Sequence, residues 1–171
     1  LWLLERHGYE AVAITPDTMH LDPFRTSREE VERIAALLVR TRLVPVITTG
    51  ARFVLDPERK HEPTLMTRDV GLRERRLDYY DRCARLGREL GAGVLGFWSG
   101  IDRRPGQDSF FWLVEGVRKT CAIVRRHGLV PAIEPEPGMA VETLADYGKL
   151  CDALGSEAPS LCLDVGHLHV V

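Results

Sequence analysis

The sequence predicts an α/β fold: a partial (β/α)8 TIM barrel with about strands 2–6 of the eight, in which outer helices cover a parallel sheet. Short apolar runs alternate with amphipathic helical segments, which is the pattern of βαβ units. One unit also recurs, because Arg6-His7-Gly8 and Arg126-His127-Gly128 each end a helical segment and precede an apolar run. Glycine suits the left-handed position after a helix, and basic residues suit the negative end of the helix dipole.

The number of units indicates that the barrel is incomplete. A full barrel needs about 250 residues, whereas this chain has 171 residues and five apolar runs. It opens on the tail of a helix and stops soon after its fifth run, so we expect one domain over residues 1–171 with both ends truncated. The sheet should then be open, with Val12, Ile14, Leu161 and Leu163 exposed on its outer strands. The alternative is a complete five-stranded doubly wound domain.

The apolar runs are short and nearly continuous, as expected of parallel strands covered on both faces. They fall near residues 10–15, 44–49, 93–98, 129–134 and 160–165. Helical patterns lie near residues 27–41, 70–90, 109–127 and 141–154. The first helix opens with Ser27 and Glu30, whose spacing is typical of a capping box. The connection over residues 50–69 is too long for an ordinary loop and is a candidate functional loop.

The composition is that of a folded globular domain, with 44% hydrophobic and 28% charged residues. The net charge of −2 and the pI near 6.3 do not favour a nucleic-acid partner, because such domains usually have a pI above about 9. No apolar run reaches the roughly 18 residues that span a bilayer, so no membrane association is expected. We interpret the four cysteines as reduced core residues, which favours a cytoplasmic location. They are Cys83, Cys121, Cys151 and Cys162.

Two carboxylates directly follow apolar runs. Glu134 follows Ala132-Ile133, and Asp164 follows Leu161-Cys162-Leu163, with His167 three residues further on. A carboxylate at the end of a buried strand is costly unless something compensates its charge, and a divalent ion does this well. Because the carboxyl ends of parallel strands meet at one edge of the sheet, we expect these three side chains to converge on a metal ion. Alternatively, Glu134 pairs with an arginine and Asp164 caps the next helix.

Other polar and aromatic residues at the same edge are candidates for substrate binding. Arg52 and His61 lie in the long connection, where they are placed to close over an anionic or polyhydroxylated molecule. Trp98 leaves the third run and is able to stack on a sugar. A solvated surface loop and a core or rim aromatic are the alternatives for these residues.

Ile133-Glu134-Pro135-Glu136-Pro137-Gly138, followed by Leu163-Asp164-Val165-Gly166-His167, resembles the xylose isomerase-like TIM-barrel superfamily. That superfamily includes sugar-phosphate isomerases and epimerases and also endonuclease IV. The resemblance implies that Glu134 and Asp164 are metal ligands and that His167 contacts substrate or metal. The remaining ligands, a His and a Glu, come from strands seven and eight, which this chain lacks. Glu136 stands where family members often have a His, so we place it among the substrate-binding candidates with an open role.

The resemblance therefore implies a divalent-metal-dependent isomerase or epimerase of a sugar or sugar phosphate. Glu134 and His167 are the catalytic candidates, and Mn, Mg, Co and Zn are all candidate metals. The expected partner is a small sugar-like substrate, and a homo-oligomer stays open. The alternatives are an endonuclease IV-like phosphodiesterase and a non-catalytic binding barrel. The nuclease is disfavoured because the third strand of its barrel ends at a His. The matching run in this chain, at residues 44–49, ends instead in Thr48-Thr49. The fragment alone is expected to be inactive.

Overall fold

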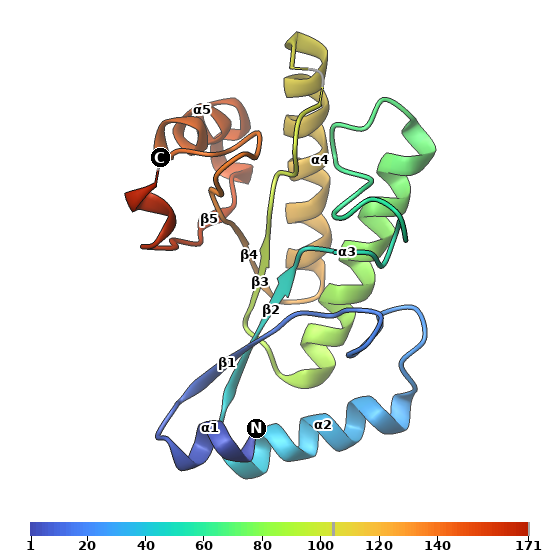
Figure 1. Cartoon of the computed structure of the whole chain (residues 1–171), viewed down its shortest axis with the longest axis vertical. Coiled ribbons are helices and arrows are strands. Elements are labelled where there is room, and N and C mark those ends of the chain that lie inside the picture. The colour runs from blue at the N-terminus through green and yellow to red at the C-terminus, as the bar shows by residue number, and fades with distance from the viewer. Residues whose placement is uncertain (104, 171) are drawn as a thin grey trace.

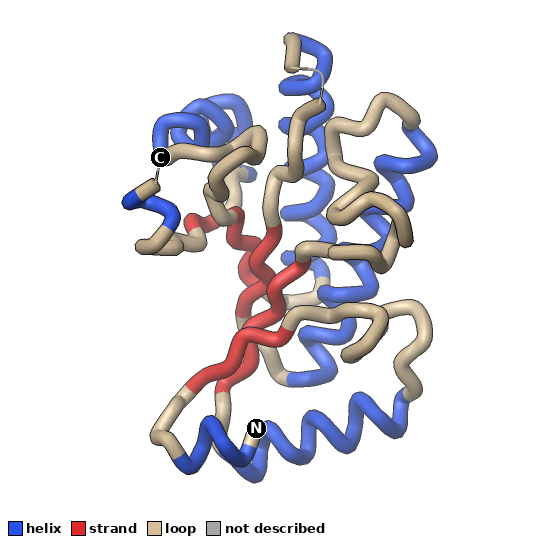
Figure 2. The backbone as a smooth tube through the Cα atoms, viewed as in Figure 1, coloured by secondary structure: helices blue, strands red, loops and turns tan. Residues whose placement is uncertain are grey.

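The computed structural model describes residues 1–103 and 105–170. Strands and helices alternate along these residues, and the strands lie in the middle of the molecule with the helices around them (Figures 1 and 2). The strands are β1 (Ala11–Ile14), β2 (Val44–Thr49), β3 (Val94–Phe97), β4 (Val130–Ile133) and β5 (Ser160–Leu161). The α-helices are α1 (Trp2–Arg6), α2 (Arg28–Thr41), α3 (Val70–Leu90), α4 (Gln107–Arg126) and α5 (Leu144–Leu154). Two short 3₁₀ helices follow, η1 (Gly155–Glu157) and η2 (His167–His169).

The sheet is parallel throughout, and its strand order is β1-β2-β3-β4-β5. Each new strand is added beside the previous one, so the order never reverses. A doubly wound domain requires such a reversal, at which its ligand usually binds. The doubly wound alternative is therefore wrong, and the singly wound arrangement is that of an open part of a (β/α)8 barrel.

The predicted cap of α2 by Ser27 and the predicted glycines after helices are present, whereas the return bond of the capping box, from Glu30 to Ser27, is not among the described contacts. Ser27 caps α2 by accepting a hydrogen bond from the backbone N–H of Glu30 at 3.2 Å. Gly8 and Gly128 follow helices with φ of 75° and 83°, a left-handed conformation that glycine adopts without a side-chain clash. These glycines turn the chain from each helix into the next strand, which explains why the His-Gly unit recurs.

The core lies between the sheet and the helices that follow its strands. Ile47, Leu95 and Ile133, from the three central strands, are fully buried. Burial of such a side chain contributes about 1.5–3 kcal/mol. The helices meet these strands with fully buried side chains of their own, which include Tyr79, Tyr80, Val117, Val124 and Leu150. The core thus holds the carboxyl ends of β2, β3 and β4 in fixed register.

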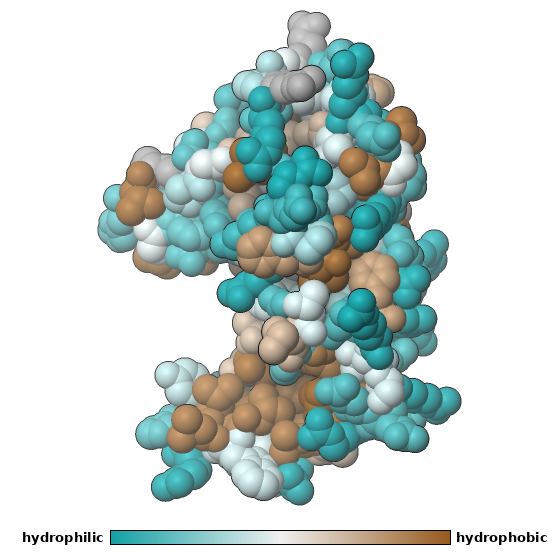
Figure 3. All heavy atoms as spheres, turned by 45° about the vertical axis from the view of Figure 1, so that its right-hand side comes forward, coloured by the Kyte–Doolittle hydropathy of each residue, from teal (hydrophilic) through white to brown (hydrophobic). Residues whose placement is uncertain are grey.

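The outer strands pair on one side only within the described residues, as predicted for an open sheet. Leu161 and Leu163 are exposed, at 37% and 50% of their surface, and Val12 is half-buried. Figure 3 shows hydrophobic side chains gathered at the lower end of the molecule, where α1, β1 and α2 lie. The expected exposure of Ile14 is wrong, because its side chain belongs to the buried core cluster.

The cysteines are free thiols, as predicted. Cys83 and Cys121 are buried, whereas Cys151 and Cys162 are partly exposed. Burial raises the pKa of the Cys83 thiol to about 12 and that of Cys121 to about 11, so both behave as small apolar residues. Among the helices of the described residues, none has the length and apolar character needed to cross a membrane.

Candidate metal centre

Glu134 stands at the carboxyl edge of the sheet, one residue beyond β4. Its backbone N–H donates to the carbonyl of Phe97 at 3.0 Å and so continues the pairing of β4 with β3. Its side chain is only 16% exposed. A carboxylate this far from water needs compensating donors or a cation, and its place in the ladder leaves its backbone little freedom to move away.

Asp164 and His167 form a tight turn beyond β5. Oδ1 of Asp164 accepts hydrogen bonds from the backbone N–H groups of Gly166 at 2.7 Å and His167 at 3.1 Å. These bonds fix the carboxylate and leave Oδ2 facing the imidazole of His167, whose Nε2 lies 3.8 Å away. Asp164 therefore shapes its own turn and still presents one oxygen to the neighbouring residues.

Glu134, Asp164 and His167 converge, as the sequence predicts. Nδ1 of His167 lies 3.6 Å from Oε1 of Glu134, and one ligand atom from each of the three residues lies within 4.8 Å of the others. No arginine or lysine pairs with either carboxylate among the described ion pairs, so the alternative in which an arginine neutralises Glu134 finds no support there. Two carboxylates and an imidazole form a donor set that suits Mn²⁺, Mg²⁺, Co²⁺ or Zn²⁺.

Glu136 lies beside this cluster with one oxygen unsatisfied. Its Oε2 is buried and has no hydrogen-bond partner in the structure. Burial raises the pKa of the Glu136 carboxyl, and the negative charge of Glu134 adds to the effect. A buried acceptor without a donor is costly, so it marks a place where a ligand would supply the missing contact. The residues present therefore fit a divalent ion with a polar molecule beside it.

Trp98, which follows β3, donates its indole N–H to Oε2 of Glu134 at 2.8 Å. This contact was not predicted from the sequence, from which the ring was expected either to stack on a sugar or to be a core or rim aromatic. The hydrogen bond occupies one oxygen of Glu134, while the other faces His167. The sequence did indicate that Trp98 and Glu134 lie near each other, since both directly follow strands whose ends meet at one edge of the sheet.

Arg52 and His61 lie in the same long loop after β2, but the first is exposed and the second is partly buried. Arg52 is 63% exposed and lies 3.7 Å from Oδ2 of Asp17, in the loop after β1. His61 is partly buried, and its Nδ1 lies 2.5 Å from the carbonyl of Gly50. Since a carbonyl only accepts, Nδ1 carries the proton. Burial lowers the pKa of His61, so its neutral form is favoured.

The carboxyl ends of β1 and β2 carry hydroxyl groups. The Oγ1 atoms of Thr15 and Thr48 lie 2.6 Å apart, and Thr49 Oγ1 donates to the carbonyl of Gly96 at 2.9 Å. These hydroxyls connect neighbouring strands. The carboxyl end of β2 thus offers hydroxyls, and the imidazole of the loop that follows, His61, is tied through Nδ1 to a backbone carbonyl of that loop.

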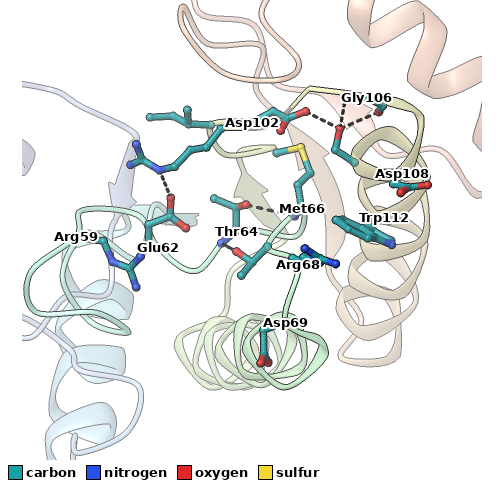
Figure 4. Close-up of a pocket in the computed structure, with 14 residues that line it drawn as sticks. Arg59, Glu62, Thr64, Met66, Arg68, Asp69, Asp102, Gly106, Asp108 and Trp112 are labelled. Atoms are coloured by element: carbon teal, nitrogen blue, oxygen red, sulfur yellow. Dashed lines mark hydrogen bonds and ion pairs between the residues drawn. The ribbon is translucent and has the colours of Figure 1, made fainter.

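A cavity of about 1040 Å³ lies between the loop over residues 59–69 and the segment that leads into α4 (Figure 4). It includes none of the three candidate metal ligands. Two of its acids are engaged by their neighbours: Arg103 donates to Glu62 at 2.8 Å, and Ser109 donates to Asp102 at 2.6 Å. We therefore place the candidate chemistry at the edge of the sheet and not in this larger cavity.

Comparison with known proteins identifies the family and the fold. The family model of the xylose isomerase-like TIM barrel matches residues 2–171. The fold is similar to D-allulose 3-epimerase from Methylomonas sp., at a TM-score of 0.80 and 15% identity, covering 98% of this chain and 56% of that chain. No curated protein matches the sequence.

Two further structures share the fold. AP endonuclease, family 2, from Brucella melitensis is similar at a TM-score of 0.75 and 17% identity, covering 96% of this chain and 61% of that chain. A xylose isomerase-like TIM barrel protein from Mycobacterium smegmatis, in complex with magnesium, gives a TM-score of 0.69 at 16% identity, covering 97% of this chain and 55% of that chain. The chain thus spans little more than half the length of the proteins it resembles.

Proposed function

Since the chain belongs to the xylose isomerase-like TIM-barrel family, we propose that it forms part of a divalent-metal-dependent isomerase or epimerase of a sugar or sugar phosphate. The observation that carries the proposal is the convergence of Glu134, Asp164 and His167 at the carboxyl edge of the sheet. The similarity in fold to a D-allulose 3-epimerase supports the same reaction class. The activity belongs to the complete protein, and we propose that this chain alone is inactive and that the protein is cytoplasmic.

Glu134 and Asp164 are the proposed metal ligands. The chemistry that a divalent ion supplies when bound in such a site is polarisation of the substrate carbonyl. Glu134 is also the proposed acid/base group. It takes the proton from the carbon next to the carbonyl, the electron pair of that C–H bond forms the carbon–carbon double bond of an enediolate, and the carbonyl π pair moves onto its oxygen. The Glu that the family resemblance places on the eighth strand, outside this chain, would return a proton to the opposite face of the same carbon; the oxygen then re-forms its carbonyl and the epimer results. A positioned base of this kind contributes about 10²–10⁴ in rate.

The remaining candidates are proposed to hold the substrate. His167 donates to a substrate oxygen, and the orphaned Oε2 of Glu136 accepts from a substrate hydroxyl. Trp98 contacts Glu134, His61 packs beside Trp98, and Arg52 lies in the same loop as His61. These three residues are proposed to contact the rest of the substrate. The substrate class that fits these groups is a small molecule with a carbonyl beside several hydroxyls.

The test is turnover by the complete protein with Mn²⁺ or Co²⁺ added. D-allulose and other ketoses, with and without phosphate, are incubated in D₂O, and deuterium incorporation at carbon is followed by NMR. We expect exchange and epimer formation, and a loss of about 10²–10⁴ in rate for Glu134→Gln but not for the exposed Glu58→Gln. Full activity of Glu134→Gln would contradict the proposal.

The same preparation distinguishes the isomerase or epimerase from the endonuclease IV-like alternative. We expect no cleavage of duplex DNA that contains an abasic site, since hydroxyls occupy the strand exit where the nuclease offers an imidazole. Abasic-site cleavage without sugar turnover would replace the epimerase proposal by the phosphodiesterase. A complete protein that binds Mn²⁺ and ketoses but gives neither reaction would be a non-catalytic binding barrel.

A further inference from the structure

The carboxylate of Glu134 has two oxygens in two different surroundings. Oε2 accepts the indole N–H of Trp98 at 2.8 Å, and Oε1 faces Nδ1 of His167 at 3.6 Å. A hydrogen bond to a carboxylate is stronger than a neutral one, so it restrains rotation of the carboxyl plane. The indole therefore restrains the orientation of the Glu134 carboxylate, in which Oε1 faces His167.

The indole ring is itself held by the loop after β2. A Cβ atom on Gly50 would lie 2.0 Å from Cζ3 of Trp98, so the ring packs directly on the glycine backbone. The ring of His61 meets the same indole edge-on, with centroids 5.7 Å apart and planes at 72°. His61 is tied to Gly50 through Nδ1. Trp98 thus sits in a slot formed by two residues of one loop.

Two residues of helix α3 contact His61 of this slot and Trp98 within it. Arg76, only 2% exposed, donates from Nη1 to the carbonyl of His61 at 3.2 Å. Its guanidinium lies over the rings of Tyr79 and Tyr80 and makes no ion pair among the described residues. Tyr80 donates its hydroxyl to the carbonyl of Trp98 at 3.5 Å. A contact path therefore runs from α3 through His61 and Trp98 to Glu134.

We propose that Trp98 is a positioning residue for Glu134, with Gly50 and His61 holding its indole N–H on Oε2. This inference deepens the proposed function and rests on it for its consequence in catalysis. It differs from the sugar contact proposed for the ring, because the effect passes through the carboxylate. Partners of this kind around a metal ligand typically change metal affinity or activity by about 10–100-fold when removed.

The hydrogen bond is tested on this chain without metal, by ¹H–¹⁵N NMR of the indole groups. The chain has three tryptophans, and Trp98→Phe identifies the signal of Trp98. We expect that signal to lie downfield and to exchange slowly with solvent. It should move upfield in Glu134→Gln, which removes the charge from the acceptor, and stay in place in Glu136→Gln. An unchanged Trp98 signal in Glu134→Gln would overturn the proposal.

The slot is tested by adding one methyl group. Gly50→Ala forces the indole to move without altering Glu134, so it should shift the Trp98 signal in the same direction as Glu134→Gln. Gly148→Ala is the matched control, because nothing lies within 4 Å of a Cβ at that position. A Gly50→Ala spectrum that matches wild type would show that the loop does not hold the ring.

The catalytic consequence is tested on the complete protein with Mn²⁺. Trp98→Phe keeps an aromatic ring and removes the N–H, and we expect kcat to fall about 10–100-fold, whatever change in KM the altered ring contact adds. A rise in KM with unchanged kcat would assign Trp98 to substrate contact alone and overturn the positioning role. Should Trp98→Phe fail to fold, Gly50→Ala is measured in its place, and we expect the same fall in kcat. Failure of the proposed function would appear as wild-type inactivity, whereas the NMR result reports the hydrogen bond independently.

Discussion

His167 and Glu134 approach each other across neighbouring strand exits, with Nδ1 of the imidazole 3.6 Å from Oε1 of the carboxylate. Glu134 is fixed by the β4–β3 ladder, whereas His167 is fixed by the turn that Asp164 caps. Two independent backbone devices thus bring an acid and an imidazole together. This convergence concentrates negative charge at one edge of the sheet.

Replacement of Glu136 by glutamine should stabilise the metal-free chain. Burial and the charge of Glu134 raise the pKa of the Glu136 carboxyl in the folded state, so ionisation costs stability. The cost is absent below the unfolded pKa near 4.5 and grows as the pH rises through the folded pKa. In EDTA, Glu136→Gln should therefore unfold at a higher temperature than wild type at pH 7 and gain least near pH 3.5. A gain in unfolding temperature no larger than that of the exposed Glu58→Gln would show that ionisation of Glu136 does not destabilise the folded chain.

His61 should make the chain less stable in mild acid. Burial lowers its pKa in the folded state, so the unfolded chain binds a proton more readily. Its contribution is fully present above the unfolded pKa of about 6.5 and is lost as the pH falls from there toward the folded pKa. Between pH 7.5 and 5, His61→Gln should lose less stability in urea than wild type does. The exposed His7→Gln is the control and should follow wild type; equal slopes for all three would contradict the assignment.

Gly116→Ala should lower the free energy of unfolding, because the added methyl group displaces Leu65 of the long loop after β2. A Cβ on Gly116, in α4, would lie 2.9 Å from Cβ of Leu65, which is 1% exposed. Overpacking of this kind costs about 1–3 kcal/mol, partly offset by the better helix propensity of alanine. Gly148→Ala, which meets open space in α5, should instead stabilise by about 0.5–1 kcal/mol. Urea unfolding of both variants measures the difference, and equal effects would show that Leu65 does not anchor the loop.

Most of the fold could be predicted because each signal is local. Apolar runs, helix periodicity and the His-Gly unit depend on residues close in sequence, and β2 and α3 have the predicted bounds. The cluster of Glu134, Asp164 and His167 was also predictable, since exits of adjacent parallel strands share an edge. β5 is shorter than expected: Cys162 still donates to the carbonyl of Ile133, and two residues later the chain enters the turn at Asp164.

Contacts between distant segments were not predictable. The bond from Trp98 to Glu134 depends on how a flexible side chain is packed by Gly50, and nothing in the local sequence encodes that direction. The burial of Arg76 likewise depends on where the loop over residues 50–69 lies, as does the pairing of Arg52 with Asp17. Such long loops carry no periodic pattern, so only the folded chain shows which groups they cover.

The central claim is that Glu134, Asp164 and His167 hold a divalent ion, and anomalous diffraction from crystals soaked in Mn²⁺ tests it most directly. The structure predicts one manganese peak within bonding distance of a carboxylate oxygen from Glu134 and from Asp164, near the imidazole of His167. The peak should disappear in crystals of Glu134→Gln and remain in those of the exposed Asp152→Asn. An absent peak at saturating Mn²⁺, or a peak bound elsewhere, would contradict the account.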